Sequence, residues 1–256
     1  MKRIYAIGGG EIKNKETIEL DAYLVDKAKE HAGSKRPYAL FIPTASHDFM
    51  PYYNSFHKIY TGVFNVKTDV ALTVYHDYGL EKIKNKFLKA DIIYVGGGNT
   101  LFMIDSWKKT GILDLITEAY NREVIICGLS AGAICWFEDI YTDSLESEYK
   151  KDIPYSMAKG LGWIKGVVSP HYDERAEDFD EIVLNNYDEA IGIENNSMIE
   201  IIDGKITQSF SSNNKNALRI IRRNDRLSKE SIKPQIILSA SISVSNKNNE
   251  NEVNNG

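Results

Sequence analysis

The residues 128–132, Gly-Leu-Ser-Ala-Gly, form a G-x-S-x-G motif, a pattern that can present a serine hydroxyl as a nucleophile. The motif follows the apolar run VIIC and precedes the helix-compatible run AGAICWF. In that context a sharp turn between a strand and a helix lifts the hydroxyl above the sheet, and backbone N–H groups at the helix start can stabilise an oxyanion. The alternative is a tight turn that happens to hold a serine where a helix begins. The strand–turn–helix context favours a nucleophile at Ser130.

A serine hydroxyl needs a base to take its proton, and histidine is the usual one. His171 directly follows the apolar run WIKGVVSP, so we expect it where a strand ends. It could be an ordinary loop residue, but in combination with Ser130 its position favours the base. The other histidines are interpreted as exposed or structural residues: His31, His47, His57 and His76.

A run of three glycines at residues 96–98 follows a strand-like segment and precedes Asn99. Glycines let a backbone present its N–H groups to an anion, and the Asn99 amide could add a contact to a substrate. The phosphate-binding motifs G-x-G-x-x-G and G-x-x-x-x-G-K-[ST] do not fit here. We therefore interpret the run as an oxyanion-binding loop opposite Ser130. A second glycine run at residues 8–10 is either another such loop or a plain turn after the first strand.

Short apolar runs alternate with amphipathic stretches through the first half of the chain. This alternation predicts an α/β protein with a mostly parallel sheet and helices on both faces. Ligands of such sheets bind past the carboxyl ends of the strands, where we place the glycine run at residues 96–98, Ser130 and His171. The expected strands cover residues 2–7, 38–43, 66–74, 91–95, 123–127 and 163–169, and the expected helices cover residues 16–32, 51–64, 80–88, 100–108 and 112–121.

After residue 190 the pattern changes to short strands, expected at residues 191–194, 197–202, 205–210 and 216–223, with a hairpin at Asp203-Gly204. We interpret residues 1–228 as one α/β domain and residues 229–256 as a C-terminal extension. From about residue 245 the tail is rich in Asn, Glu and Lys. Such a segment cannot bury enough apolar surface to offset the entropy lost on ordering, so we expect it to be disordered.

Composition and charge exclude several classes of protein. The 256 residues carry 31 Lys and Arg against 36 Asp and Glu, a net charge of −5, which argues against a nucleic-acid-binding protein. No apolar run reaches the length of about 18 residues that a membrane span requires. The N-terminal segment is interpreted as a first strand rather than a signal peptide. Cys127 and Cys135 fit neither a disulfide framework nor a metal site, so we expect a reducing cytoplasm.

The segments YVGGGNT, CGLSAGAICWF and SPHYD, in that order and spacing, resemble peptidase family S51. That family includes peptidase E (aspartyl dipeptidase) and the cyanophycinases, and the resemblance is closest to the uncharacterised bacterial peptidase E-like branch. Covering about residues 1–225, it implies a flavodoxin-like, class I glutamine-amidotransferase-like three-layer fold. It also implies a serine nucleophile, a histidine base and an acid. By position, Ser130 matches the nucleophile and His171 the base, and Gly98 and Ala131 match the N–H donors of the oxyanion hole.

The acid is where this sequence departs from the family. The family places a carboxylate at the position of Asn195, and Glu194 precedes it by one residue. Neighbouring side chains of a strand point to opposite faces, so Glu194 is not a free substitute. An asparagine can orient a histidine, but it does not stabilise the imidazolium as a carboxylate does. Asp143 resembles a position implicated in peptidase E and could support the site, or it could be a cap or turn residue. The identity of the acid stays open among these three residues.

Substrate recognition is less evident from the sequence. The acidic stretch at residues 173–181 is expected to be a solvated first turn of a helix. Within it, Arg175 is a candidate for substrate binding because a guanidinium can hold a carboxylate by two hydrogen bonds. Peptidase E uses an arginine after its histidine for an N-terminal aspartate. The resemblance thus implies a small peptide with an acidic N-terminal residue as substrate, no cofactor and no metal. We expect no nucleic-acid or membrane partner, and a monomer or homodimer.

Two rival interpretations remain. The first is a catalytically weak homologue that acts as a binding or regulatory protein, because Asn195 stands where the acid is expected. The second is an esterase or amidase that acts on a substrate other than a peptide.

Overall fold

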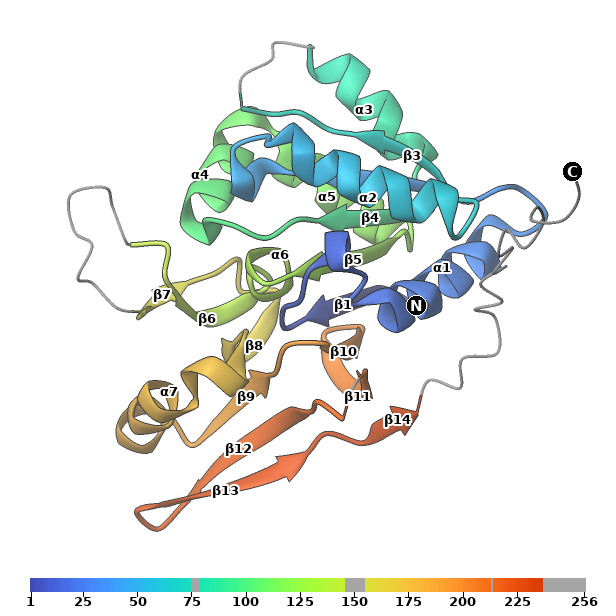
Figure 1. Ribbon diagram of the computed structural model, residues 1–256. Coiled ribbons are helices and arrows are strands. Elements are labelled where there is room, and N and C mark those ends of the chain that lie inside the picture. The colour runs from blue at the N-terminus through green and yellow to red at the C-terminus, as the bar shows by residue number, and fades with distance from the viewer. Residues whose placement is uncertain (75–78, 146–154, 213, 237–256) are drawn as a thin grey trace, which may run out of the picture.

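The computed structural model describes residues 1–74, 79–145, 155–212 and 214–236 (Figure 1). His76 and the tail expected to be disordered lie outside the described residues. The helices are α1 (Ile18–Ala32), α2 (Met50–Gly62), α3 (Leu80–Lys89), α4 (Thr100–Thr110), α5 (Ile112–Asn121), α6 (Ala131–Ile134) and α7 (Tyr172–Asn186), with 3-10 turns η1 (Ile12–Asn14) and η2 (Thr44–Ser46). The strands are β1 (Arg3–Ile7), β2 (Tyr38–Ile42), β3 (Lys67–Val70), β4 (Ile92–Val95), β5 (Ile125–Leu129), β6 (Phe137–Thr142), β7 (Ser156–Lys159), β8 (Ile164–Ser169), β9 (Glu189–Ile193), β10 (Ser197–Ile202), β11 (Lys205–Ser211), β12 (Ala217–Arg223), β13 (Arg226–Ser231) and β14 (Pro234–Ile236).

These strands form two sheets instead of the single, mostly parallel sheet that the sequence predicts. Within the described residues, the first is an 8-stranded sheet in the order β14-β11-β10-β1-β5-β4-β2-β3, and the second is a 6-stranded sheet in the order β13-β12-β9-β8-β6-β7. The strands β1, β5, β4, β2 and β3 run parallel. Antiparallel pairs join β10 to β1 and β11, β12 to β9 and β13, and β6 to β7.

The antiparallel strands follow from short connections. Asp203 and Gly204 alone separate β10 from β11, in the hairpin that the sequence predicts. A two-residue turn can join only antiparallel neighbours, because a parallel pair needs a long crossover. The parallel strands also run in the chain order 3-2-4-5-1 across the sheet, which differs from the 2-1-3-4-5 order of flavodoxin.

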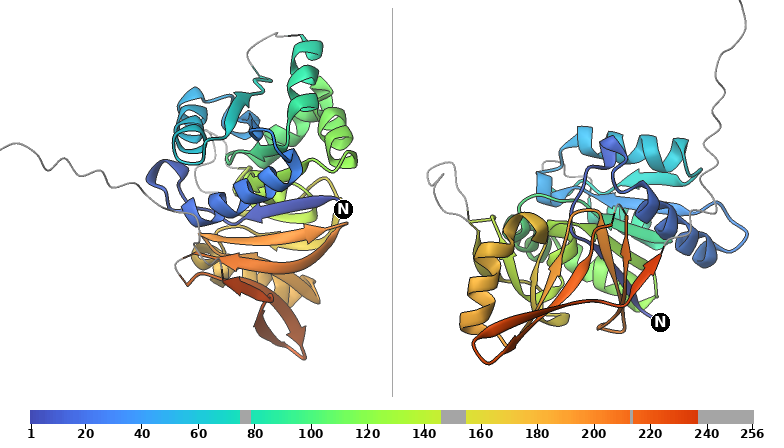
Figure 2. Two further views of the ribbon diagram at one scale, coloured as in Figure 1. Left: turned by 90° about the vertical axis from the view of Figure 1, so that its right-hand side faces the viewer. Right: turned by 60° about the horizontal axis from the view of Figure 1, so that its bottom comes forward.

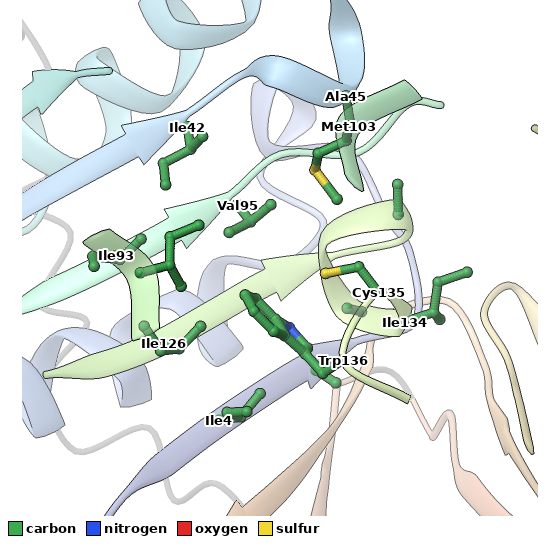
Figure 3. Packing of buried hydrophobic residues seen from close by; sticks show 14 of the residues in the cluster. Ile4, Ile42, Ala45, Ile93, Val95, Met103, Ile126, Ile134, Cys135 and Trp136 are labelled. Carbon is green, nitrogen blue, oxygen red and sulfur yellow. The ribbon is translucent and has the colours of Figure 1, made fainter. Parts of the chain in front are cut away.

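Helices cover both faces of the first sheet, as expected. Alternate residues of each strand face two hydrophobic clusters, so Tyr5 and Ile7 pack with α1 and α2, while Ile4 and Ala6 pack on the opposite face. That opposite face is covered by α3, α4, α5 and α6 and includes Trp136 (Figure 3). The second sheet shares this cluster and packs its other face on α7 (Figures 1 and 2).

The C-terminal strands extend past the expected domain boundary. Residue 228 falls inside β13, and β14 continues the chain to Ile236. Because β14 pairs in parallel with β11, part of the expected extension belongs to the first sheet.

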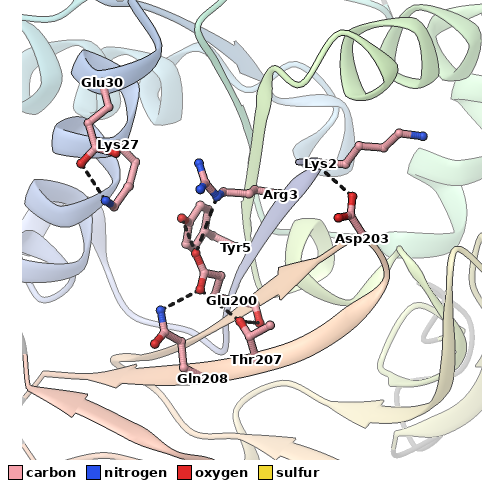
Figure 4. Close-up of polar contacts among 9 residues, drawn as sticks. All are labelled: Lys2, Arg3, Tyr5, Lys27, Glu30, Glu200, Asp203, Thr207 and Gln208. Atoms are coloured by element: carbon pink, nitrogen blue, oxygen red, sulfur yellow. Dashed lines mark hydrogen bonds and ion pairs between the residues drawn. The ribbon is translucent and has the colours of Figure 1, made fainter.

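A buried carboxylate ties β1 to the hairpin beside it (Figure 4). Glu200 of β10 accepts hydrogen bonds from Tyr5 of β1 (2.8 Å), Thr207 (3.0 Å) and Gln208 (2.7 Å). Buried carboxylates are stable only when their oxygens find such partners. The network holds β1 and β10 in register, and the segments that follow β1 and precede β10 both reach the candidate site.

Candidate active site

Ser130 lies at a sharp turn between β5 and α6. Its backbone has φ 53° and ψ −112°, which is uncommon for a residue with a side chain. Its neighbours in the motif must be small, because a Cβ on Gly128 would lie 2.1 Å from the carbonyl oxygen of Gly132. A Cβ on Gly132 would lie 2.3 Å from that of Val95. The strand–turn–helix context predicted from the motif is therefore present, although α6 is only four residues long.

His171 lies at the start of α7, just past the end of β8. Its φ of 48° turns the chain sharply, and its N–H donates to the carbonyl of Gly8 (3.1 Å). This turn brings the imidazole to Ser130, with 2.8 Å between Nε2 and Oγ. Ser130 follows a strand of the first sheet and His171 follows a strand of the second, so the contact bridges the two sheets.

Asn195 occupies the other side of the imidazole. It lies between β9 and β10, and its Oδ1 is 2.7 Å from Nδ1 of His171. Glu194 does not reach the histidine, because its Oε2 instead accepts from the backbone N–H of Asn216 (2.7 Å). Of the two neighbouring candidates for the acid, the structure thus brings the asparagine to His171.

Behind Asn195 lies a group of charged residues that the sequence did not reveal. The Asn195 amide Nδ2 donates to Glu174 (2.6 Å), and its backbone N–H donates to Asp173 (2.9 Å). Asp173 is in turn paired with Lys215 (2.7 Å). Both acids belong to the first turn of α7, where carboxylates are favoured by the helix dipole, and this is why the stretch resembles an ordinary solvated helix start.

A cavity of about 1000 Å³ opens beside Ser130 and His171. Its wall includes Gly97 and Gly98, as well as Tyr52, whose hydroxyl accepts from the N–H of Gly97 (3.2 Å). A Cβ on Gly97 would lie 3.4 Å from that of Ser130, so this glycine loop lies directly against the nucleophile candidate. The charged residues that line the cavity are Glu11, Lys13, Glu16, Asp173, Glu174 and Lys215.

Of the two oxyanion candidates, one lines the cavity and the other follows Ser130 in the chain, whereas Asn99 has a structural role. Gly98 lines the cavity with φ 136°, and Ala131 begins α6 directly after the serine. Asn99 caps α4 by accepting from the N–H of Phe102 (2.9 Å), and its Nδ2 donates to the carbonyl of Ser144 (3.1 Å). Both ends of the Asn99 amide are therefore engaged within the protein.

Arg175 and Asp143 lie beside each other and away from the cavity wall. The Arg175 side chain is only 6% exposed, and its guanidinium is stacked on the Tyr155 ring at 4.0 Å and lies 3.6 Å from Asp143. Among the described residues that line the cavity, neither of the two is present. Arg175 thus influences the charge of His171 from outside the lining of this cavity.

The surroundings of His171 favour the neutral imidazole. Burial lowers the pKa of His171 below its usual value, and the positive charge of Arg175 lowers this pKa further. The hydrogen bond to Asn195 and the charges of Glu174 and Asp143 act in the opposite direction. The net result is a histidine whose base form persists to lower pH than that of a free histidine.

The described residues contain no cluster of three or more His, Cys, Asp or Glu side chains that could hold a metal ion. Cys127 and Cys135 are buried free thiols, and burial raises the pKa of both. Among the helices of the described residues, none is both long and apolar enough to cross a membrane.

Comparison with known proteins identifies relatives over most of the chain. The model of the family described as Peptidase family S51 matches residues 4–209. An uncharacterized peptidase of Bacillus subtilis (strain 168), YgaJ, is 30% identical over 83% of this chain and 88% of its own length. Peptidase E of Nostoc sp. is 26% identical over 72% of this chain and 77% of its own.

A solved structure shows the same fold. The crystal structure of a peptidase from an acI-B1 Actinobacterium aligns with a TM-score of 0.65 at 18% identity, covering 91% of this chain and 95% of that one. At this identity the likeness concerns the fold alone.

Proposed function

This chain belongs to peptidase family S51, and from that premise we propose that it is a serine peptidase of the peptidase E type that hydrolyses small peptides. The observation that carries the proposal is the 2.8 Å contact between Ser130 Oγ and His171 Nε2 at the edge of a cavity. A nucleophile and a base within hydrogen-bond distance, with the base oriented by a third group, are what covalent catalysis by serine requires.

In the proposed reaction, Nε2 of His171 takes the proton of Ser130 while Oγ attacks the carbonyl carbon of the peptide bond. The N–H groups of Gly98 and Ala131 stabilise the negative oxygen of the tetrahedral intermediate. His171 then gives its proton to the leaving amine, and an acyl group stays on Ser130. Water, activated by the same histidine, releases the acyl group and restores the serine. No step requires a cofactor.

The preference for a peptide with an acidic N-terminal residue rests on the family alone. Lys13 and Lys215 line the cavity and could contact an acidic side chain, although Lys215 is already paired with Asp173. Arg175, the sequence candidate for this contact, lies outside the cavity lining. A cytoplasmic location is likewise a proposal, supported by the two buried free thiols, which a reducing compartment keeps unpaired.

Because Asn195 stands where the acid is expected, a second candidate function is that of a weakly active homologue, which binds peptides without turning them over efficiently. Replacing the orienting aspartate of the Ser-His-Asp triad by asparagine lowers turnover by about 10⁴ in trypsin. The two candidates differ in the wild-type turnover of dipeptides, which is substantial for the peptidase and near the uncatalysed rate for the binding protein.

The first test is labelling by a fluorophosphonate, which reacts with activated serines. We expect the wild-type protein to be labelled and Ser130→Ala to be unlabelled, with peptide hydrolysis lost in parallel. Ser46→Ala serves as the control, because Ser46 lies in η2 and its hydroxyl donates to the Pro43 carbonyl of its own turn. Equal labelling of the wild type and Ser130→Ala would contradict the proposal.

A further inference from the structure

The asparagine beside His171 poses a chemical problem, because its amide has two different ends. If Oδ1 faces the imidazole, Nδ1 must carry the proton, and Nε2 is free to accept the proton of Ser130. If the NH₂ group faces the imidazole, Nδ1 must accept, Nε2 carries the proton, and the histidine cannot act as a base. In trypsin this wrong tautomer is the reason that an asparagine in place of the triad aspartate costs about 10⁴ in turnover.

Glu174 removes that ambiguity. Its Oε1 lies 2.6 Å from the Asn195 Nδ2, on the side of the amide opposite His171. An ionised carboxylate accepts hydrogen bonds and cannot donate them, so the amide atom that faces Glu174 must be the NH₂ group. The Asn195 oxygen is then left for His171, and the only hydrogen bond it can make there is from an Nδ1–H group.

The backbone of Asn195 is held independently of its side chain. Its N–H donates to Asp173 (2.9 Å), and Lys215 holds that carboxylate from the other side (2.7 Å). These contacts hold the backbone of Asn195 beside the first turn of α7, where Glu174 also lies.

We propose that Glu174 is a positioning residue that fixes the orientation of the Asn195 amide and, through it, the Nδ1-protonated tautomer of His171. The inference rests on the proposed peptidase function. It extends the site to four residues in a line, Glu174, Asn195, His171 and Ser130, joined by hydrogen bonds of 2.6, 2.7 and 2.8 Å. Glu174 touches neither Ser130 nor the reacting atoms. Its negative charge also favours the imidazolium that forms during the reaction, in addition to the hydrogen bond between His171 and Asn195.

The test combines substitutions at both positions with a direct measurement of the tautomer. We would compare the wild type, Glu174→Gln, Asn195→Asp and the double variant by the ¹⁵N chemical shifts of His171 at a pH where the imidazole is neutral. The same four proteins would be assayed for kcat and KM on a dipeptide. Glutamine can donate to Oδ1, so Glu174→Gln permits the inverted amide. We expect it to populate the Nε2-protonated tautomer and to lower kcat about 10- to 100-fold, a smaller loss than the factor of about 10⁴ in trypsin. KM should change little.

With an aspartate at position 195 the expected effect of Glu174→Gln is reversed. Asn195→Asp alone places two carboxylates in contact and lowers activity, because like charges at this distance repel. In the double variant the glutamine donates to the introduced carboxylate, and both the Nδ1-protonated tautomer and kcat should return. A residue that only supports the fold would instead cause a loss in both backgrounds.

Glu177→Gln is the matched control, because it makes the same change of charge on the same helix at an exposed position. It should leave both the tautomer and kcat unchanged. An unchanged His171 tautomer and kcat in Glu174→Gln would overturn the inference. The ¹⁵N spectra can be read even if the wild type hydrolyses no peptide, so failure of the proposed function and failure of the Glu174 role are distinguishable.

Discussion

The imidazole of His171 can take a proton from Ser130 only while it is neutral, so its pKa sets the acid limit of the proposed reaction. Burial and Arg175 lower this pKa, and Asn195, Glu174 and Asp143 oppose them. Activity should therefore be present above the lowered pKa and should disappear as the pH falls through it. We expect the acid limb of kcat/KM to lie below pH 6.5, the usual pKa of histidine.

Arg175→Gln should move that limb upward. The substitution removes a positive charge that disfavours the imidazolium, so the pKa of His171 rises and activity is lost at a higher pH than in the wild type. Arg175→Lys keeps the charge and is the control. The pH dependence of dipeptide hydrolysis measures both variants, and a limb that does not move in Arg175→Gln would show that this guanidinium has no influence on the base.

A sequence motif can identify a residue that stands in a distinctive local sequence. It cannot identify a residue whose role depends on which side chain it contacts in the folded protein. Ser130 and His171 each stand in a distinctive local context, and the structure joins the two side chains, while their catalytic roles stay predictions. Glu194 and Asn195 differ by a single step along the chain, and only the turn after β9 decides which of them faces the histidine. Glu174 has no distinctive context, because acids in the first turn of a helix are common.

At the scale of elements, the turn after β1 keeps the His171–Asn195 contact in place. Gly9 packs so tightly there that an added Cβ would lie 2.0 Å from Oδ1 of Asn195 and 2.3 Å from Nδ1 of His171. Gly9→Ala should therefore separate these two side chains without altering Ser130. We expect kcat/KM to fall at least about 100-fold, because misplacement by about 1 Å can cost that much.

Gly62→Ala is the control for this substitution. Gly62 ends α2, and a Cβ there would meet nothing within 4 Å. Alanine should leave the activity unchanged and should stabilise the helix by up to about 1 kcal/mol. Thermal unfolding of both variants, followed by circular dichroism, separates a local effect of Gly9→Ala on the site from a general loss of structure.

Most elements of the first sheet were predictable, because strand and helix periods alternate clearly up to residue 127. The run AGAICWF is compatible with a helix, but α6 ends at Ile134 and Phe137 already begins β6. A short apolar run fits both a buried strand and a buried helix, so its period does not decide between them. The division of the strands into two sheets could not be predicted either, since local sequence patterns identify strands but not the strands with which they pair.

At the scale of the whole molecule, one buried acid should make stability depend on pH. Asp21 of α1 accepts hydrogen bonds from Thr17 (2.8 Å) and from Tyr60 of α2 (2.9 Å). Burial raises the pKa of Asp21 from 3.8 to about 6, although these hydrogen bonds lower it. The folded protein thus holds the proton more tightly than the unfolded chain, so this group stabilises the fold below pH 3.8, and the contribution is lost as the pH rises through about 6.

Asp21→Asn should remove this dependence. Since one pKa unit corresponds to about 1.4 kcal/mol, the free energy of unfolding of the wild type relative to the variant should fall by up to about 3 kcal/mol between about pH 3.5 and about pH 7. Urea unfolding at several pH values measures the difference. Asp26→Asn, at a half-exposed position on the same helix, is the control for the loss of a carboxylate from α1. Parallel curves for the wild type and Asp21→Asn would mean that Asp21 is ionised equally easily in both states.

The position of the Ser130–His171 contact between the two sheets has a consequence for synthesis on the ribosome. Ser130 is translated 41 residues before His171, and Asn195 follows another 24 residues later. A nascent chain that has completed the parallel strands of the first sheet thus carries the hydroxyl but not its partners. We expect the nascent polypeptide to have no peptidase activity until the second sheet has been made and has docked.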